Sequence, residues 1–276
     1  WRWSSKDLDA LEMAVRETGI PVAGLLAEPM VPLTDPTQHE AFLEGLKRSI
    51  EVAQRFGAPA LIAQAGADLP GQPRATQRAA LVTALGRAAD ILAGSGVVLM
   101  LEPLNTRVDH VGYFLPSTVE GLDIVDEVNR PEIRLIYDIY HSAVMDEEIA
   151  DVIGGRLDRI VHVHLADTPG RHEPGSGMMD WQRRLDWLEA AGYTGLVGLE
   201  YKPTGPTLET LGTSSGKWGM MNVFAAIVTF AIFSARLYCA SKAFSATEVQ
   251  ETVLWSVGAL FKMIAAARLR MYLCVN

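Results

Sequence analysis

The feature that most constrains the fold of this chain is a regular alternation of short apolar runs with longer segments of mixed polarity. Runs such as IPVAGLLA and VVLMLEP carry almost no charge, as is typical of strands buried on both faces of a parallel sheet. The six predicted strands span residues 20–27, 60–66, 97–103, 133–140, 159–166 and 195–201. The alternation predicts a parallel α/β fold, either a doubly wound sheet or a (β/α)₈ barrel.

The segments between these runs predict helices, which parallel strands need as crossover connections. A first helix is expected to begin at a cap formed by Ser4 or Ser5 and to stop at Gly19. The other predicted helices span residues 39–56, 75–93, 118–128, 147–153 and 180–191.

Hydrophobic content, net charge and cysteine content limit the classes of protein to which this chain can belong. The chain has 276 residues, 49% of them hydrophobic, which is enough for one large core. Its net charge of −9 excludes non-specific binding to the phosphate backbone of nucleic acids. Two cysteines, Cys239 and Cys274, cannot supply a disulfide framework, and the first residues of the sequence show no pattern of a secretory signal. These features favour a cytoplasmic protein.

Four chemically reactive side chains recur at equivalent places on four successive predicted strands. Glu102, Asp138, His164 and Glu200 each lie near the carboxyl end of a strand, at separations of 36, 26 and 36 residues, about one β/α unit each. A curved sheet brings such positions together. Buried charges are costly unless they are paired or bound to a metal. Three carboxylates and one imidazole suit Mn²⁺, Mg²⁺ or Co²⁺ better than a structural zinc.

Four motifs surround these residues: LEPLN at 101–105, YDIYH at 137–141, HVHLADTPGRHEPGSG at 162–177 and GLEYKP at 198–203. They resemble the hydroxypyruvate isomerases and their relatives among the xylose isomerase-like TIM-barrel sugar isomerases and epimerases. The resemblance covers residues 1–211 and implies a (β/α)₈ barrel. PGRHEPGSG, the most specific motif, resembles the hydroxypyruvate isomerase branch. A histidine at position 164 is typical of the epimerases, so the epimerase branch stays open as well.

The resemblance implies a divalent metal ion held by Glu102, Asp138, His164 and Glu200, with Glu102 and Glu200 also forming the catalytic acid/base pair. One carboxylate is expected to remove a proton beside the carbonyl and the other to return it to the neighbouring carbon, through an enediolate. This chemistry needs no redox cofactor.

Four further residues are expected to bind the substrate. His141 matches the family's substrate-contacting histidine, and Arg171 and His172 lie in a Gly/Pro-bounded loop where a guanidinium suits the carboxylate of a small keto acid. Asn105 is expected either to orient a substrate hydroxyl or to cap a turn. The role of Glu173 stays open.

The resemblance leaves both ends of the chain unusual. It makes residues 1–3 the end of the second barrel strand, so the barrel is expected to be incomplete at its N-terminus. Residues 1–211 form the expected barrel domain, and residues 212–276 form an atypical apolar, basic tail of helical character. Residues 210–276 have a net charge of +4, against −13 for the rest. Three interpretations of the tail are open: a membrane anchor, helices that complete the barrel, or a mis-joined non-native segment. Membrane contact is expected only through the uncharged residues 218–235.

The sequence therefore predicts a metal-dependent aldose/ketose-type isomerase that interconverts hydroxypyruvate and tartronate semialdehyde or a similar small hydroxy-keto acid or sugar. Three alternatives stay open: a ketose 3-epimerase or other sugar isomerase of the superfamily, a metal-dependent endonuclease-like hydrolase, and an inactive membrane-tethered remnant. The expected partner is a small molecule, and the oligomeric state is left open.

Overall fold

A computed structural model describes residues 2–207, 210 and 273–274 of the chain. Its parallel strands are β1 (Val22–Leu26), β2 (Ala60–Gln64), β3 (Val98–Glu102), β4 (Ile133–Asp138), β5 (Ile160–Leu165), β6 (Leu196–Leu199) and β7 (Leu273–Cys274). The α-helices are α1 (Leu8–Thr18), α2 (His39–Phe56), α3 (Arg74–Leu92), α4 (Thr118–Val128), α5 (Ile139–Val144), α6 (Ile149–Ile153) and α7 (Trp181–Ala190). The short 3₁₀ helices are η1 (Trp3–Ser5), η2 (Pro36–Gln38) and η3 (Leu157–Arg159).

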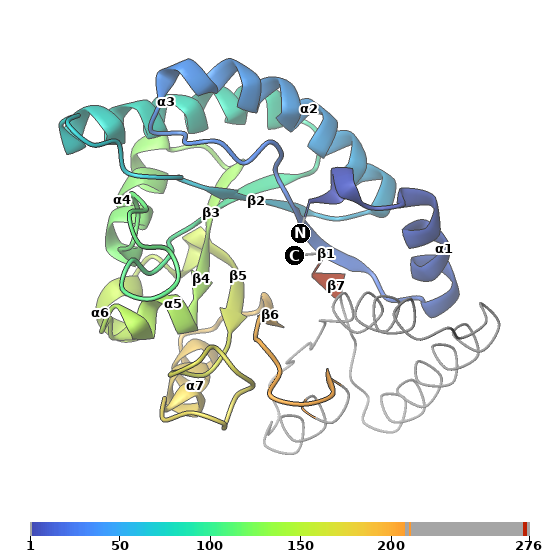
Figure 1. The fold of residues 1–276 in the computed structure, drawn as a ribbon, viewed down its shortest axis with the longest axis vertical. Coiled ribbons are helices and arrows are strands. Elements are labelled where there is room, and N and C mark those ends of the chain that lie inside the picture. The colour runs from blue at the N-terminus through green and yellow to red at the C-terminus, as the bar shows by residue number, and fades with distance from the viewer. Residues whose placement is uncertain (1, 208–209, 211–272, 275–276) are drawn as a thin grey trace.

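The strand order decides between the two predicted α/β architectures. The strands lie in the order β6-β5-β4-β3-β2-β1-β7, and each described pair is parallel. A doubly wound sheet would reverse direction at a switch point and carry helices on both faces. Here β1 to β6 follow chain order and curl into an open half-barrel with the helices on its outer side (Figure 1). This is the arrangement of a TIM barrel.

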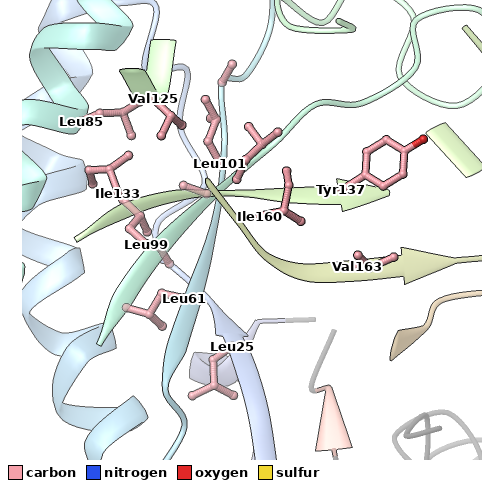
Figure 2. Close-up of a cluster of buried hydrophobic side chains, with 14 of the residues drawn as sticks. Leu25, Leu61, Leu85, Leu99, Leu101, Val125, Ile133, Tyr137, Ile160 and Val163 are labelled. Atoms are coloured by element: carbon pink, nitrogen blue, oxygen red, sulfur yellow. The ribbon is translucent and has the colours of Figure 1, made fainter. Parts of the chain in front are cut away.

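The two faces of the curved sheet bury different sets of side chains, as the two-residue period of a strand requires. Leu61, Leu99 and Leu135 point outward into the large core shared with the helices. Figure 2 shows Leu61 and Leu99 in this core. Met100 and Ile136, one residue along, belong to a separate small cluster on the inner face. Positions 102, 138 and 164 share the inner parity, so the fold directs their side chains into the barrel.

Most predicted elements are confirmed within two residues at each end, and two details are wrong. Ser4 and Ser5 lie in η1, and the cap of α1 is Asp7, whose carboxylate accepts a hydrogen bond from the Ala10 N–H. The strand predicted over 133–140 ends at Asp138, because α5 begins at the next residue.

The structure describes the N-terminal end of the chain, for which the end of a strand was predicted, but only a small part of the C-terminal tail. Trp3 begins η1 and does not lie in a strand. Within the tail, Leu273–Cys274 form β7, which pairs with β1, and residues 211–272 lie outside the described part of the chain. Among the described residues, no helix has both the length and the apolarity to cross a bilayer. The uncharged stretch 218–235, through which membrane contact was expected, lies outside the described residues.

Two helical glycines offer a test of how tightly α2 packs at the rim of the barrel. A Cβ at Gly45 would overlap the Glu28 carbonyl oxygen and the Pro29 ring, whereas a Cβ at Gly86, inside α3, would meet no atom within 4 Å. We expect Gly45→Ala to lower the free energy of unfolding by about 1–3 kcal/mol. Gly86→Ala should raise it by about 0.5–1 kcal/mol, because alanine favours the helix. Urea unfolding measures both, and an equal response of the two variants would contradict this packing.

Candidate metal and active site

The four residues predicted at strand ends converge at the carboxyl end of the half-barrel. Glu102 ends β3, Asp138 ends β4, His164 lies in β5 beside Asp138, and Glu200 directly follows β6. One ligand atom from each lies within 4.8 Å of the others. Asp138 and His164 are at most 1% exposed in their side chains, Glu102 6% and Glu200 22%. The cluster is therefore buried at its base and open on the side of Glu200.

The hydrogen bonds within the cluster leave one oxygen uncompensated. His164 Nδ1 lies 3.2 Å from Glu102 Oε1 and 3.1 Å from Glu200 Oε2. Asp138 Oδ1 caps α5 by accepting from the N–H groups of Tyr140 and His141. Asp138 Oδ2 is buried and accepts no hydrogen bond from any described residue. Its neighbours are His141 Nε2 at 3.6 Å and an Arg171 nitrogen at 3.8 Å.

This arrangement fits a divalent cation. Three carboxylates and an imidazole form a hard, oxygen-rich set, and a buried carboxylate oxygen without a donor is the group that a cation would satisfy. The cluster could thus hold a metal ion, and its donor types are those that Mn²⁺, Mg²⁺ and Co²⁺ accept in proteins.

The two glutamates of the cluster have opposite pKa shifts. Burial raises the pKa of Glu102, and the nearby Glu200 charge adds to this, against the opposing effect of His164. For Glu200, the effect of burial would raise the pKa, but the positive charges of His164 and Arg171 together have the larger effect. The net result is a pKa lowered to about 2. The environment therefore favours the protonated form of Glu102 and the ionised form of Glu200.

His141 and Asn105 lie beside the cluster and contact each other. Asn105 is fully buried, and its backbone N–H and side-chain amide approach His141 Nδ1 at 3.2 and 2.6 Å. Because both groups donate, Nδ1 accepts and the ring proton is on Nε2, which faces Asp138. Burial lowers the pKa of His141 to about 4, so the ring is neutral at pH 7. Asn105 Oδ1 also accepts from the N–H groups of Val108 and Asp109, so it caps a turn as well.

Arg171 reaches the cluster from the loop after β5. Its guanidinium donates to Glu200 Oε2 at 2.8 Å and lies 5.3 Å from the centre of the Tyr140 ring. The loop is held by Asp167, a fully buried carboxylate that accepts from the N–H groups of Thr168, Gly175 and Met179. A buried carboxylate therefore holds the backbone of the loop that carries Arg171.

The hydrogen bonds of the His172 and Glu173 side chains join the loop after β5 to the segment after β6. His172 Nδ1 donates to the Lys202 carbonyl at 2.6 Å, and Glu173 accepts from the N–H and hydroxyl of Thr204. These contacts tie the loop to the segment after β6, and the binding of substrate by His172 stays a prediction.

Asp109 and Tyr140 belong to the site but were not predicted from the sequence. Asp109 Oδ2 accepts from Asn105 Nδ2 at 2.9 Å and from the Tyr140 hydroxyl at 2.6 Å. Tyr140 lies inside the YDIYH motif, a signal that could have drawn attention to it. Asp109 lies in a loop with no periodicity, so no local pattern marks it.

The raised pKa of Glu102 leads to a prediction about the stability of the metal-free protein. A carboxyl whose pKa is raised by folding contributes stability below its unfolded pKa, and this is lost as the pH rises through the folded value. We therefore expect Glu102→Gln, unfolded in a chelator at pH 7.5, to be more stable than the wild type by about 1 kcal/mol. The gain should vanish near pH 4. The exposed Glu44→Gln is the control, and a loss of stability in Glu102→Gln at pH 7.5 would contradict this account.

Comparisons with known proteins agree with this geometry. Residues 1–215 match the model of the family described as xylose isomerase-like TIM barrel, and residues 200–276 match a family of unknown function, DUF6768. The chain is 32% identical to hydroxypyruvate isomerase of Escherichia coli over 61% of this chain and 65% of that protein. It is 31% identical to 2-oxo-tetronate isomerase of Cupriavidus necator over 64% and 68%.

Among solved structures, AP endonuclease, family 2, from Brucella melitensis is similar at 26% identity and a TM-score of 0.71. The match covers 79% of this chain and 86% of that one. With the family model matching most of its length, the curled parallel sheet and the cluster at its carboxyl end fall into a known group: this chain belongs to the xylose isomerase-like TIM-barrel family.

Proposed function

We propose that this protein is a metal-dependent isomerase of small hydroxy-keto acids that interconverts hydroxypyruvate and tartronate semialdehyde. The observation that carries the proposal is the meeting of three carboxylates and an imidazole beside a partly buried guanidinium, that of Arg171. The two relatives named above support it, since both are named as isomerases of small acids that carry a carbonyl.

In this proposal Glu102, Asp138, His164 and Glu200 hold the cation, which when bound polarises the substrate carbonyl and stabilises negative charge on its oxygens. One of the two glutamates removes the proton from the hydroxyl-bearing carbon, and the other delivers a proton to the former carbonyl carbon. A second proton passes from the hydroxyl oxygen to the carbonyl oxygen, so the atoms balance. His141 holds its Nε2–H toward the cluster and donates to a substrate oxygen.

Arg171 accounts for the proposed preference for an acid. Burial lowers its pKa, but Glu200 and Asp138 raise it by more, so the guanidinium stays charged. A charged fork at the open side of the cluster can pair with the carboxylate of a keto acid. A neutral ketose would leave this pairing unused, which is why we place ketose 3-epimerase second. DNA hydrolysis ranks lower, because residues 1–209 have a net charge of −13.

The proposal is tested by isomerisation in D₂O. Chelator-treated protein with Mn²⁺ restored is incubated with hydroxypyruvate and, separately, with a panel of neutral ketoses, and proton NMR follows deuterium at the carbons beside the carbonyl. We expect deuterium to enter hydroxypyruvate and tartronate semialdehyde to form, both stopping when the chelator is added again. Glu102→Gln and Glu200→Gln should each lower kcat by at least about 100-fold.

Three results would contradict the proposal. Full activity in either glutamine variant would remove the acid/base assignment. Exchange confined to a neutral ketose would favour the epimerase, and cleavage of abasic duplex DNA at low salt without any exchange would favour the hydrolase. A control variant with a distant exposed glutamate, Glu44→Gln, should behave as the wild type.

A further inference from the structure

One carboxylate at the rim of the site connects groups from three barrel elements. Asp109 lies in the loop after β3, and its side chain is 12% exposed. Its Oδ2 accepts from Asn105 after β3 and from the hydroxyl of Tyr140 in α5. Its Oδ1 lies 3.6 Å from the ammonium of Lys202 after β6. None of these contacts joins Asp109 to Glu102, Asp138, His164 or Glu200. Asp109 therefore acts on the site through Asn105, Tyr140 and Lys202.

The first partner leads to His141. One hydrogen of the Asn105 amide is donated to Asp109, and the other is directed at His141 Nδ1, 2.6 Å from the amide nitrogen. Asp109 therefore holds the amide nitrogen between itself and the imidazole. With two donors at Nδ1, the tautomer that carries its proton on Nε2 is favoured, and this is the nitrogen 3.6 Å from Asp138.

The second partner leads to Arg171. The Tyr140 hydroxyl is fixed on Asp109 at 2.6 Å, and the ring of the same tyrosine lies 5.3 Å from the Arg171 guanidinium. A cation held over an aromatic ring is attracted by the electron density of the ring face. Arg171 in turn donates to Glu200. Both groups that we assign to the substrate thus rest on side chains that Asp109 anchors.

We propose that Asp109 is a positioning residue that fixes His141 through Asn105 and Arg171 through Tyr140. The inference rests on the proposed function for its catalytic consequence, but its structural half does not depend on any activity. A shared acceptor explains why a carboxylate lies at this point of the rim, since a neutral side chain without an acceptor would leave the donors of Asn105 and Tyr140 unpaired.

The test compares Asp109→Ala and Asp109→Asn with a matched control, Asp146→Asn. Asp146 also ties the loop after β3, through Arg107, but it is 80% exposed and has no contact with His141 or Tyr140 among those described. The first measurement is the ring-nitrogen NMR spectrum of ¹⁵N-histidine-labelled, metal-free protein, with the His141 signals assigned by their loss in His141→Gln. The second is kcat and KM for hydroxypyruvate with Mn²⁺ present.

We expect the His141 nitrogen shifts of Asp109→Ala to move toward values averaged over both tautomers, and kcat/KM to fall about 10–100-fold. Asp109→Asn keeps an oxygen acceptor and should show a smaller change in both, and Asp146→Asn should stay within about twofold of the wild type. If Asp109→Ala fails to fold, Asp109→Asn carries the comparison.

Unchanged His141 shifts in the Asp109 variants would overturn the proposal whatever the activity. If the His141 nitrogen shifts change but kcat/KM does not, the proposal would also be overturned, because the positioning would then have no consequence for catalysis. If the wild type isomerised no substrate, the proposed function would fail, while the NMR comparison would still decide whether Asp109 positions His141.

Discussion

The mutual repulsion of three carboxylates at the buried end of a curved sheet is the interaction on which the rest of this structure depends. Like charges so close together in a site of low dielectric cannot all be ionised without a compensating cation. The protein supplies part of the compensation through His164 and Arg171, and Asp138 Oδ2 is left without any hydrogen bond from a described residue. The remaining negative charge is what a divalent cation would neutralise.

The barrel scaffold explains how such an arrangement can persist. Side chains of alternate strand residues point inward, and the outward residues bury a continuous apolar core against the helices. That core holds the strand ends fixed, so the carboxylates cannot move apart to relieve their repulsion. Around the cluster, the partly buried Asp109 and the fully buried Asp167 hold loops through hydrogen bonds. The site thus combines a rigid strand base with a rim that is tied by hydrogen bonds.

Much of this could be predicted from the sequence because it depends on periodicity. Apolar runs at regular spacing predicted the strands. The recurrence of Glu102, Asp138, His164 and Glu200 near strand ends, about one β/α unit apart, predicted that they meet. What could not be predicted depends on contacts between distant loops. Asp109 reaches Tyr140, 31 residues away, and Glu173 reaches Thr204 over the same separation. The end of β4 was misplaced because apolar and aromatic residues flank Asp138 on both sides in IYDIY, whereas the strand ends where Asp138 caps α5.

The central claim is that Glu102, Asp138, His164 and Glu200 hold one divalent cation. The most direct measurement is a titration of chelator-stripped protein with Mn²⁺, in which electron paramagnetic resonance counts free and bound ions. This account predicts one tightly bound Mn²⁺ per chain and an affinity at least about tenfold weaker in Asp138→Asn. Asp126→Asn, at a partly exposed aspartate of α4 outside the cluster, should leave the affinity unchanged. Binding that is absent in the wild type, or equally tight in Asp138→Asn, would contradict it.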